Sequence, residues 1–121
     1  MAGRLWPSEE KEFREQLWQL RLHFTDLASF TRLYLLHIIS QHDEVTVGEL
    51  AKEARKSQPL VSWHLRRLKS SGFVLVEKRG RETYCRLNRE KLQRFLELYI
   101  DLLGLSIPNL EEGGKDGEKQ S

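Results

Sequence analysis

The chain has 121 residues, 39% of them hydrophobic and 31% charged, which predicts one globular domain and excludes a disordered protein. No run of about 18 apolar residues is present, which argues against a membrane-spanning helix, and the single cysteine excludes an internal disulfide framework. We expect a cytoplasmic protein, because a lone cysteine suits a reducing compartment and the first residues lack the apolar segment of a signal peptide.

The formal net charge of +2 is unevenly distributed along the chain. Residues 45–91 contain 12 Lys and Arg against 5 Asp and Glu, a net charge of +7, so the rest of the chain carries −5. A basic block in a nearly neutral chain favours a polyanion partner bound to that region. Charge alone leaves one alternative open, a solvated charged face without a partner.

Two amphipathic helices are expected before residue 41. Ser8 can cap the first helix, whose apolar residues recur at helical spacing: Phe13, Leu17, Leu20 and Phe24. The second helix spans residues 29–40, with Ser29 as its N-cap.

Two short helices follow. Thr46 and Glu49 form a T-x-x-E capping box, and the helix that they open is expected to end near Arg55. Ser57 can cap the next helix, which carries Val61, Leu65 and Leu68 as its buried stripe, and Gly72 stops it.

A hairpin and a last helix complete the expected order. Two runs rich in β-branched and aromatic residues flank an Arg79–Gly80 turn. Asn88 can cap a final helix that ends near Gly104 and Pro108. Residues 111–121 contain no apolar side chain, so we expect a disordered charged tail after a domain of residues 1–110.

This order predicts a winged helix-turn-helix, a mainly α fold of about five helices with a two-stranded β-hairpin wing. Such a fold suits double-stranded DNA, because a helix fits the major groove and a basic hairpin can lie along phosphates. The predicted DNA-binding residues occupy the second helix of the motif and the wing: Ser57, Gln58, Pro59, Ser62, Trp63, His64, Arg66, Arg67, Lys78, Arg79 and Arg81.

The stretch SQPLVSWHL resembles the ArsR-type winged helix-turn-helix repressors. Their S-Q-x-x-V-S-x-H-L pattern is met from Ser57 to Leu65, and the resemblance covers about residues 25–100. Upstream, LASFTRLYLL is similar to the opening of the family's second helix, with Phe30 where a proline is usual. The resemblance implies a sequence-specific DNA-binding regulator that acts as a repressor until an unidentified inducer releases it from its operator.

The same resemblance implies a homodimer formed by the first and last helices. A two-fold axis would place two recognition helices roughly 34 Å apart and predicts an inverted-repeat operator. Alternatively, the apolar residues of the first and last helices could simply pack in the core of a single chain. The expected interface residues are Phe13, Leu17, Leu20, Phe24, Leu92, Phe95, Leu96, Tyr99 and Leu103.

The chain departs from the family's metal-sensing members. GELAKEA lacks their Cys-x-Cys pair, the last helix lacks histidine, and one cysteine is too few for intramolecular disulfide exchange. We therefore expect neither a metal site nor a cofactor. Arg55 and Lys56 replace the glycine and the apolar residue usual in the turn, which predicts a looser or more basic turn.

Alternatives remain for several residues and for the function. His64 can bond a phosphate or a neighbouring side chain, or be a satisfied half-buried histidine. Trp63 can contact a thymine methyl group, cover the stems of Arg66 and Arg67, or pack on a neighbouring element. Cys85 is expected to be a small packed residue. The alternative function is a winged-helix module for protein interaction or RNA binding, while no catalytic constellation points to an enzyme.

Overall fold

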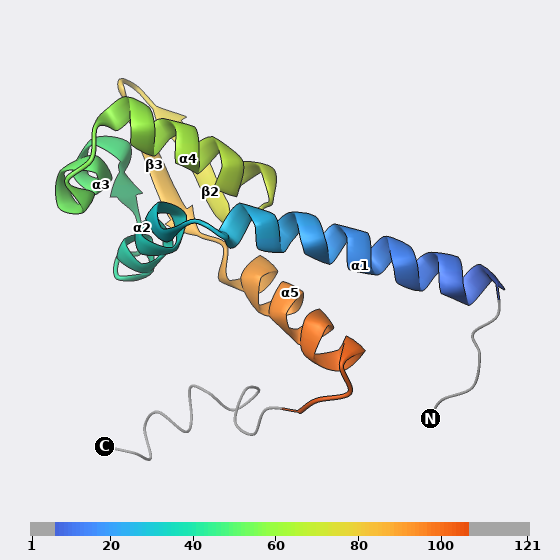
Figure 1. The fold of residues 1–121 in the computed structure, drawn as a ribbon. Helices are drawn as coiled ribbons and strands as arrows, with labels where there is room; N and C mark the ends of the chain where they lie inside the picture. The colour runs from blue at the N-terminus through green and yellow to red at the C-terminus, as the bar shows by residue number, and fades with distance from the viewer. Residues whose placement is uncertain (1–6, 107–121) are drawn as a thin grey trace, which may run out of the picture.

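The computed structural model describes residues 7–106, which form five helices and one three-stranded antiparallel sheet (Figure 1). The helices are α1 (Pro7–Leu27), α2 (Phe30–Ser40), α3 (Val47–Ala54), α4 (Gln58–Ser70) and α5 (Arg89–Leu102). The strands are β1 (Val45–Thr46), β2 (Val74–Arg79) and β3 (Glu82–Leu87). This arrangement confirms the predicted winged helix-turn-helix, while the predictions for Pro108 and for the tail of residues 111–121 lie outside the described residues.

Local sequence signals place four of the helix starts. The side chains of Ser29, Ser57 and Asn88 each accept a hydrogen bond from the backbone N–H three residues further on, at 3.2–3.3 Å. At α3, both hydrogen bonds of the capping box between Thr46 and Glu49 are present. These bonds satisfy N–H groups that have no partner inside a helix, and they confirm the four predicted caps.

The predicted start of the first helix was wrong. α1 already includes Pro7, so Ser8 lies inside the helix and is not its N-cap. Proline is tolerated in a first turn because the backbone N–H that it lacks would have no partner there.

The sheet shifts the predicted turn of the wing and adds one strand. Arg79 pairs with Glu82, which leaves Gly80 and Arg81 as the turn residues, one position later than predicted. Gly80 has a φ of +62°, a conformation that glycine adopts without a steric penalty. The hairpin of β2 and β3 is the predicted two-stranded wing, and β1 also pairs with β3, with Val45 opposite Cys85, as a third strand that the sequence did not predict. A strand of two residues is too short to show an alternating pattern in the sequence.

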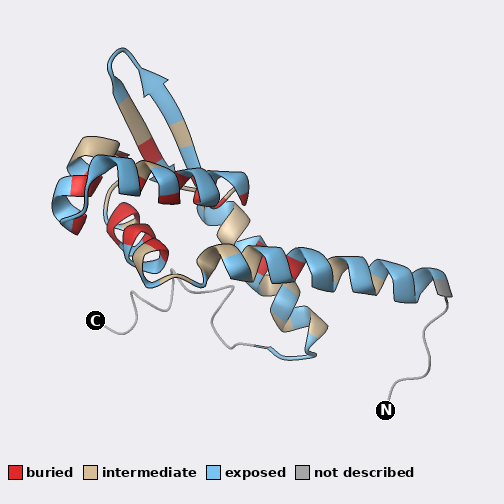
Figure 2. Ribbon diagram, turned by 45° about the horizontal axis from the view of Figure 1, so that its top comes forward, coloured by how far each residue is buried: buried red, intermediate tan, exposed pale blue. Residues whose placement is uncertain are grey.

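The core lies between α2, α3, α4 and the base of the sheet, where their inward faces are buried (Figure 2). Val61, Leu65 and Leu68 of α4 are buried, as their spacing predicted, and His64 is buried as well. α1 differs from the other helices because its first part extends away from this body (Figure 1). From Ser8 to Gln19 no side chain of α1 is buried within the chain.

Arg55 ends α3 in the left-handed conformation, with φ +58° and ψ +44°. It is the one non-glycine residue with positive φ among residues 7–106. A Cβ atom costs roughly 1–2 kcal/mol in this conformation. Part of the gain on removing it is offset by the larger freedom of glycine in the unfolded chain.

We expect Arg55→Gly to raise the free energy of unfolding by about 0.5–1 kcal/mol, measured by urea denaturation at fixed protein concentration. Arg55→Ala is the matched control, because it removes the charge but keeps the Cβ atom. Equal stabilisation by both variants would assign the effect to the lost charge and contradict a backbone origin.

Candidate nucleic-acid interface

The outer surface of α4 has two flanks. The flank toward the wing carries Ser62 and Arg66, and the flank toward the α1–α2 junction carries Trp63, His64 and Arg67. The predicted residues at the start of the helix, Ser57, Gln58 and Pro59, are exposed. The structure therefore distributes the predicted residues of α4 between two separate environments.

A polar cleft lies between the start of α3, the start of α4 and the wing. Gln58 and Ser62 line it from α4, and Arg81 and Thr83 line it from the hairpin. Ser62 also borders an adjoining depression with Arg66, Lys69 and Val76. The cleft thus brings residues predicted from the helix and from the wing onto one continuous surface.

Lys69 and Thr83 are among the residues of this surface that were not predicted to bind DNA. Lys69 lies three residues after Arg66, so helical periodicity places it on the same side of α4 and could have identified it. Thr83 lies on the outward-curving hairpin and is half-buried, and no local signal distinguishes it from other strand residues.

His64 is buried, with 8% of its surface exposed. Its Nδ1 atom lies 3.1 Å from a terminal guanidinium nitrogen of Arg32, and since arginine only donates, Nδ1 is the acceptor. Burial, followed by the charges of Arg32 and Lys56, holds the pKa of His64 below its ordinary value. Of the alternatives for His64, the geometry matches a buried histidine that bonds a neighbouring side chain.

This environment predicts a loss of stability in acid. The unfolded chain binds a proton at His64 near pH 6.5, whereas the folded chain resists protonation until a lower pH. We therefore expect the melting temperature to fall as the pH drops below about 6.5, until the lowered pKa of His64 is passed. Thermal unfolding between pH 7.5 and 5.0 measures the effect.

His64→Gln supplies the comparison, because its amide oxygen can still accept from Arg32 but does not titrate. It should show a shallower decline, whereas His37→Gln, at an exposed histidine of α2, should decline like the wild-type protein. Identical profiles for all three proteins would contradict the assignment to His64.

Trp63 is half-exposed, with 48% of its surface accessible. The guanidinium carbons of Arg32 and Arg67 each lie 6.0 Å from its ring centroid, and the ring of His64 meets it edge-on at 4.9 Å. The arginines beside the indole are therefore Arg32 and Arg67, where the sequence had suggested Arg66 and Arg67. The exposed half of the ring remains available for a contact outside the chain.

Arg67 has a partner within the chain. Its Nη2 atom lies 3.1 Å and its Nε atom 3.4 Å from Oδ1 of Asp26, in the last turn of α1. The side chain of Asp26 is 17% exposed, so this ion pair is partly shielded from water. Arg67 thus differs from Arg66, which faces the wing-side depression.

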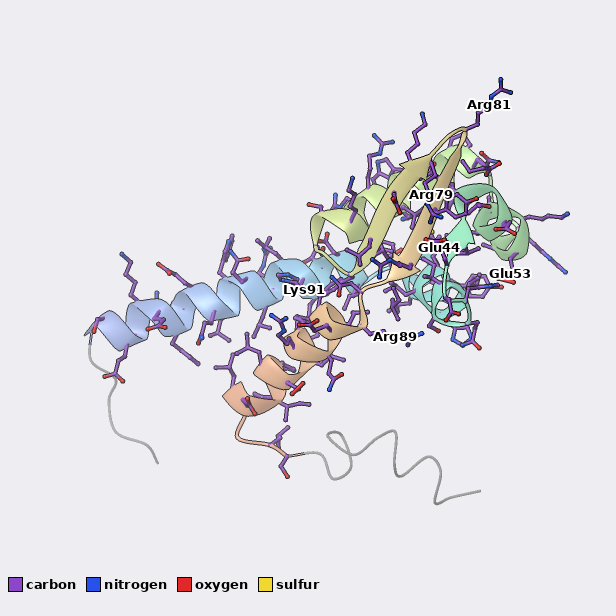
Figure 3. All side chains as sticks on the ribbon, turned by 180° about the vertical axis from the view of Figure 1, so that it is seen from behind. Glu44, Glu53, Arg79, Arg81, Arg89 and Lys91 are labelled. Atoms are coloured by element: carbon purple, nitrogen blue, oxygen red, sulfur yellow. The ribbon has the colours of Figure 1, made fainter. Side chains whose placement is uncertain are left out.

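The basic residues of the wing also differ from one another. Arg79 pairs with Glu44 and with Glu77, and its guanidinium carbon lies 3.9 Å above the ring of Tyr84. The hydrogen bond from Arg79 lowers the pKa of Glu44, and the same bond raises the pKa of Arg79. Figure 3 shows Arg79 lying back toward Glu44, whereas Arg81 points away from the body at the tip of the hairpin. Lys78 is exposed on the same hairpin.

The residues predicted at a dimer interface lie along α1 and α5. Phe24 packs edge-on against Phe95 and Tyr99, at centroid distances of 4.8 and 5.0 Å, which joins the two helices. Leu20 and Phe95 are buried in the chain's own core, while Phe13 and Leu92 are half-buried. The exposed members are Leu17, Leu96, Tyr99 and Leu103, with 37–53% of their surface accessible.

Other predicted features can be located in the described part of the chain. Cys85 is buried and donates a hydrogen bond to the Val45 carbonyl at 3.3 Å, as expected of a packed residue. Burial raises the pKa of its thiol to about 11. Within residues 7–106, no three His, Cys, Asp or Glu side chains converge as metal ligands would. Across the same range, no helix combines the length and the apolar character needed to cross a membrane.

Comparison with known proteins supplies relatives for this fold. Residues 29–76 match the family described as bacterial regulatory protein, arsR family. The arsenical resistance operon repressor of Escherichia coli is 37% identical over 65 residues, covering 54% of this chain and 56% of the relative. The chain spans 52–58% of the length of the three arsenic-resistance regulators it matches.

Two solved structures extend the comparison. Reduced HlyU from Vibrio cholerae is 26% identical, with a TM-score of 0.60 over 76% of this chain and 96% of the other. A homodimeric winged helix-turn-helix DNA-binding domain from Mycobacterium bovis, Mb0332, has a TM-score of 0.59 over 84% of this chain and 90% of the other. At 23% identity, the latter shows likeness of fold alone.

Proposed function

We propose that this chain, whose residues 29–76 match the arsR family of bacterial regulatory proteins, binds an inverted-repeat DNA operator as a homodimer and represses transcription. The family is one of transcriptional regulators and not of enzymes. The observation that carries the proposal is the cleft that Gln58 and Ser62 of α4 line together with Arg81 of the wing. Amide and hydroxyl groups suit base edges in the major groove, and a protruding arginine suits the phosphate backbone beside it.

The homodimer is supported by the first part of α1. An isolated helix of this length is marginal in water, and from Ser8 to Gln19 the chain buries none of its side chains. Leu17 on α1, Leu96 on α5 and Leu103 at the C-cap of α5 are exposed, so a second copy could cover them. The Mycobacterium bovis domain of the same fold is described as homodimeric.

The dimer would present two α4 helices to successive turns of the major groove, about 34 Å apart. This geometry requires an operator with two-fold symmetry. Repression follows if the operator overlaps a promoter, and an inducer would relieve it. A bacterial regulator that binds DNA must be in the compartment that contains the chromosome, which supports a cytoplasmic location.

A mobility-shift titration with the DNA upstream of the chain's own reading frame tests the proposal. We expect a protected inverted repeat bound with a Kd of about 10⁻⁸ M or tighter, and random duplex bound at least about a thousandfold more weakly. Equal affinity for operator, random duplex and RNA would contradict operator recognition. Binding to none of them would favour the alternative of a protein-interaction module.

The two wing arginines should affect the salt dependence of binding differently. Each phosphate contact contributes about −0.9 to the slope of log affinity against log salt concentration. Arg81→Ala is expected to flatten the slope by about one unit and to weaken operator and random DNA alike. Arg79→Ala is expected to change the slope less, because Glu44 and Glu77 already neutralise Arg79. An unchanged slope for Arg81→Ala would mean that the wing tip does not touch the backbone.

A further inference from the structure

The last turn of α1 is joined to α4 through the carboxylate of Asp26. One carboxylate oxygen accepts from Arg67 at 3.1 and 3.4 Å, and the other accepts from the hydroxyl of Ser71. Ser71 is buried, with 8% of its surface exposed, and it caps the end of α4. A single acidic group therefore contacts the last turn of α4 at two points, 41 and 45 residues away in the sequence.

The backbone of Asp26 provides a second connection. Its carbonyl oxygen accepts from Nε of Arg32, whose side chain is buried at the start of α2. The same guanidinium donates to Nδ1 of His64 at 3.1 Å. Hydrogen bonds to charged groups are stronger than neutral ones, so this arrangement cross-links α1, α2 and α4 at a point where the three helices meet.

Trp63 lies close to both arginines of this network. Arg32 and Arg67 each place a guanidinium carbon 6.0 Å from the ring centroid, and each is bonded to Asp26, one through the carbonyl and the other through the carboxylate. An indole close to two fixed cations has fewer orientations open to it than a free surface side chain.

We propose that Asp26 is a positioning residue for DNA recognition, which holds Trp63 and the end of α4 in a fixed orientation relative to the dimerising helix α1. The role rests on the proposed function, since it concerns how the recognition helix is presented. Asp26 also keeps Arg67 in an ion pair and so away from the phosphate backbone. Removal of the carboxylate should therefore lower discrimination between sequences and not simply weaken binding.

Asp26→Asn tests the proposal with little change of shape. The ratio of operator to random-duplex affinity is expected to fall about tenfold, as for loss of a hydrogen bond to a charged group. The salt slope for random duplex should steepen by up to about 0.9, because Arg67 is released toward a phosphate. Loss of stability alone would not steepen that slope.

Trp63 fluorescence gives a readout that needs no DNA. In a chain carrying Trp6→Phe and Trp18→Phe, Trp63 is the sole indole, since the sequence has three tryptophans. Asp26→Asn in that background should raise the acrylamide quenching constant and shift the emission to longer wavelength. Failure of the wild-type chain to bind DNA would contradict the proposed function. Unchanged Trp63 fluorescence on Asp26→Asn substitution would show, independently of DNA binding, that Asp26 does not hold Trp63.

Two variants complete the test. Asp43→Asn makes the same replacement at an exposed position between α2 and β1, and it should leave the affinity ratio and the fluorescence unchanged. Ser71→Ala removes one bond to Asp26 but keeps the ion pair, so the ratio should fall severalfold with an unchanged salt slope. The proposal would be overturned if Asp26→Asn folds and keeps both the wild-type ratio of operator to random-duplex affinity and the wild-type Trp63 fluorescence. If Asp26→Asn does not fold, a wild-type affinity ratio and wild-type Trp63 fluorescence in Ser71→Ala would overturn the proposal.

Discussion

Replacement of Leu96 by glutamate is expected to leave a folded monomer whose affinity for the operator is at least about a hundredfold weaker. Leu96 is 44% exposed on α5, so the carboxylate remains solvated in a single chain. In a dimer it would be buried in an apolar interface, which costs several kcal/mol. Without the second half-site the monomer also loses the gain from bivalent binding. Sedimentation and a mobility-shift titration measure the two effects.

Leu75→Glu is the matched control, because Leu75 is also half-exposed but lies on β2. Leu75 borders a depression with the first residues of α5 that includes none of the predicted interface residues. Leu75→Glu should sediment like the wild-type protein. Leu17→Glu, on α1, should behave like Leu96→Glu. A folded Leu96→Glu monomer with full operator affinity would contradict the need for a dimer, and a monomeric wild-type protein at micromolar concentration would contradict the dimer itself.

Trp63→Ala is expected to weaken operator binding by about 1–3 kcal/mol, the range for a lost base contact. The exposed half of the indole offers an apolar face that fits a thymine methyl group. Affinity for random duplex should change little. Folding stability should fall by only about 1 kcal/mol, because the cation–π contacts with Arg32 and Arg67 are partly exposed. Parallel titrations of operator and random DNA, with thermal unfolding, separate these effects.

Trp18→Ala serves as the control for this substitution. Trp18 is likewise half-exposed and has Arg21 at 4.8 Å from its ring, but it lies on α1. Because Trp18 lies in the part of α1 that a second copy would cover, the affinities are compared at a protein concentration where sedimentation shows Trp18→Ala to be dimeric. Under that condition the ratio of operator to random affinity should be unchanged. Equal weakening of both DNAs by Trp63→Ala, or a drop of many degrees in melting temperature, would show that the tryptophan does not read bases.

The features that sequence predicted correctly depend on residues close together in the chain. The caps at Ser29, Ser57 and Asn88 need a side chain and an N–H three positions away. The buried stripe of α4 needs only helical periodicity. Such signals fix the order of the elements, and that order with the S-Q-x-x-V-S-x-H-L pattern was enough to predict the winged fold.

The features that were missed depend on pairs that the fold brings together. Arg79 and Glu44 are 35 residues apart, and Arg67 and Asp26 are 41 apart, so no local pattern shows that these arginines are paired. The turn at Gly80–Arg81 was displaced by one residue because the register is fixed by cross-strand pairing. Charge composition therefore located the basic region but could not show which of its cations are already neutralised.

Cys85 provides a chemical means of following the motion of the wing. A thiol with a pKa of about 11 is ionised in only about one molecule in ten thousand at pH 7, and an alkylating reagent attacks the thiolate. Cys85 is 1% exposed, and its thiol donates to the Val45 carbonyl of the paired strand β1, so modification requires a transient opening of this part of the sheet. The chain contains one cysteine, and mass spectrometry would therefore follow a single reaction with no competing site. The alkylation rate reports how often the sheet that carries the wing opens, and DNA held along the hairpin would slow it.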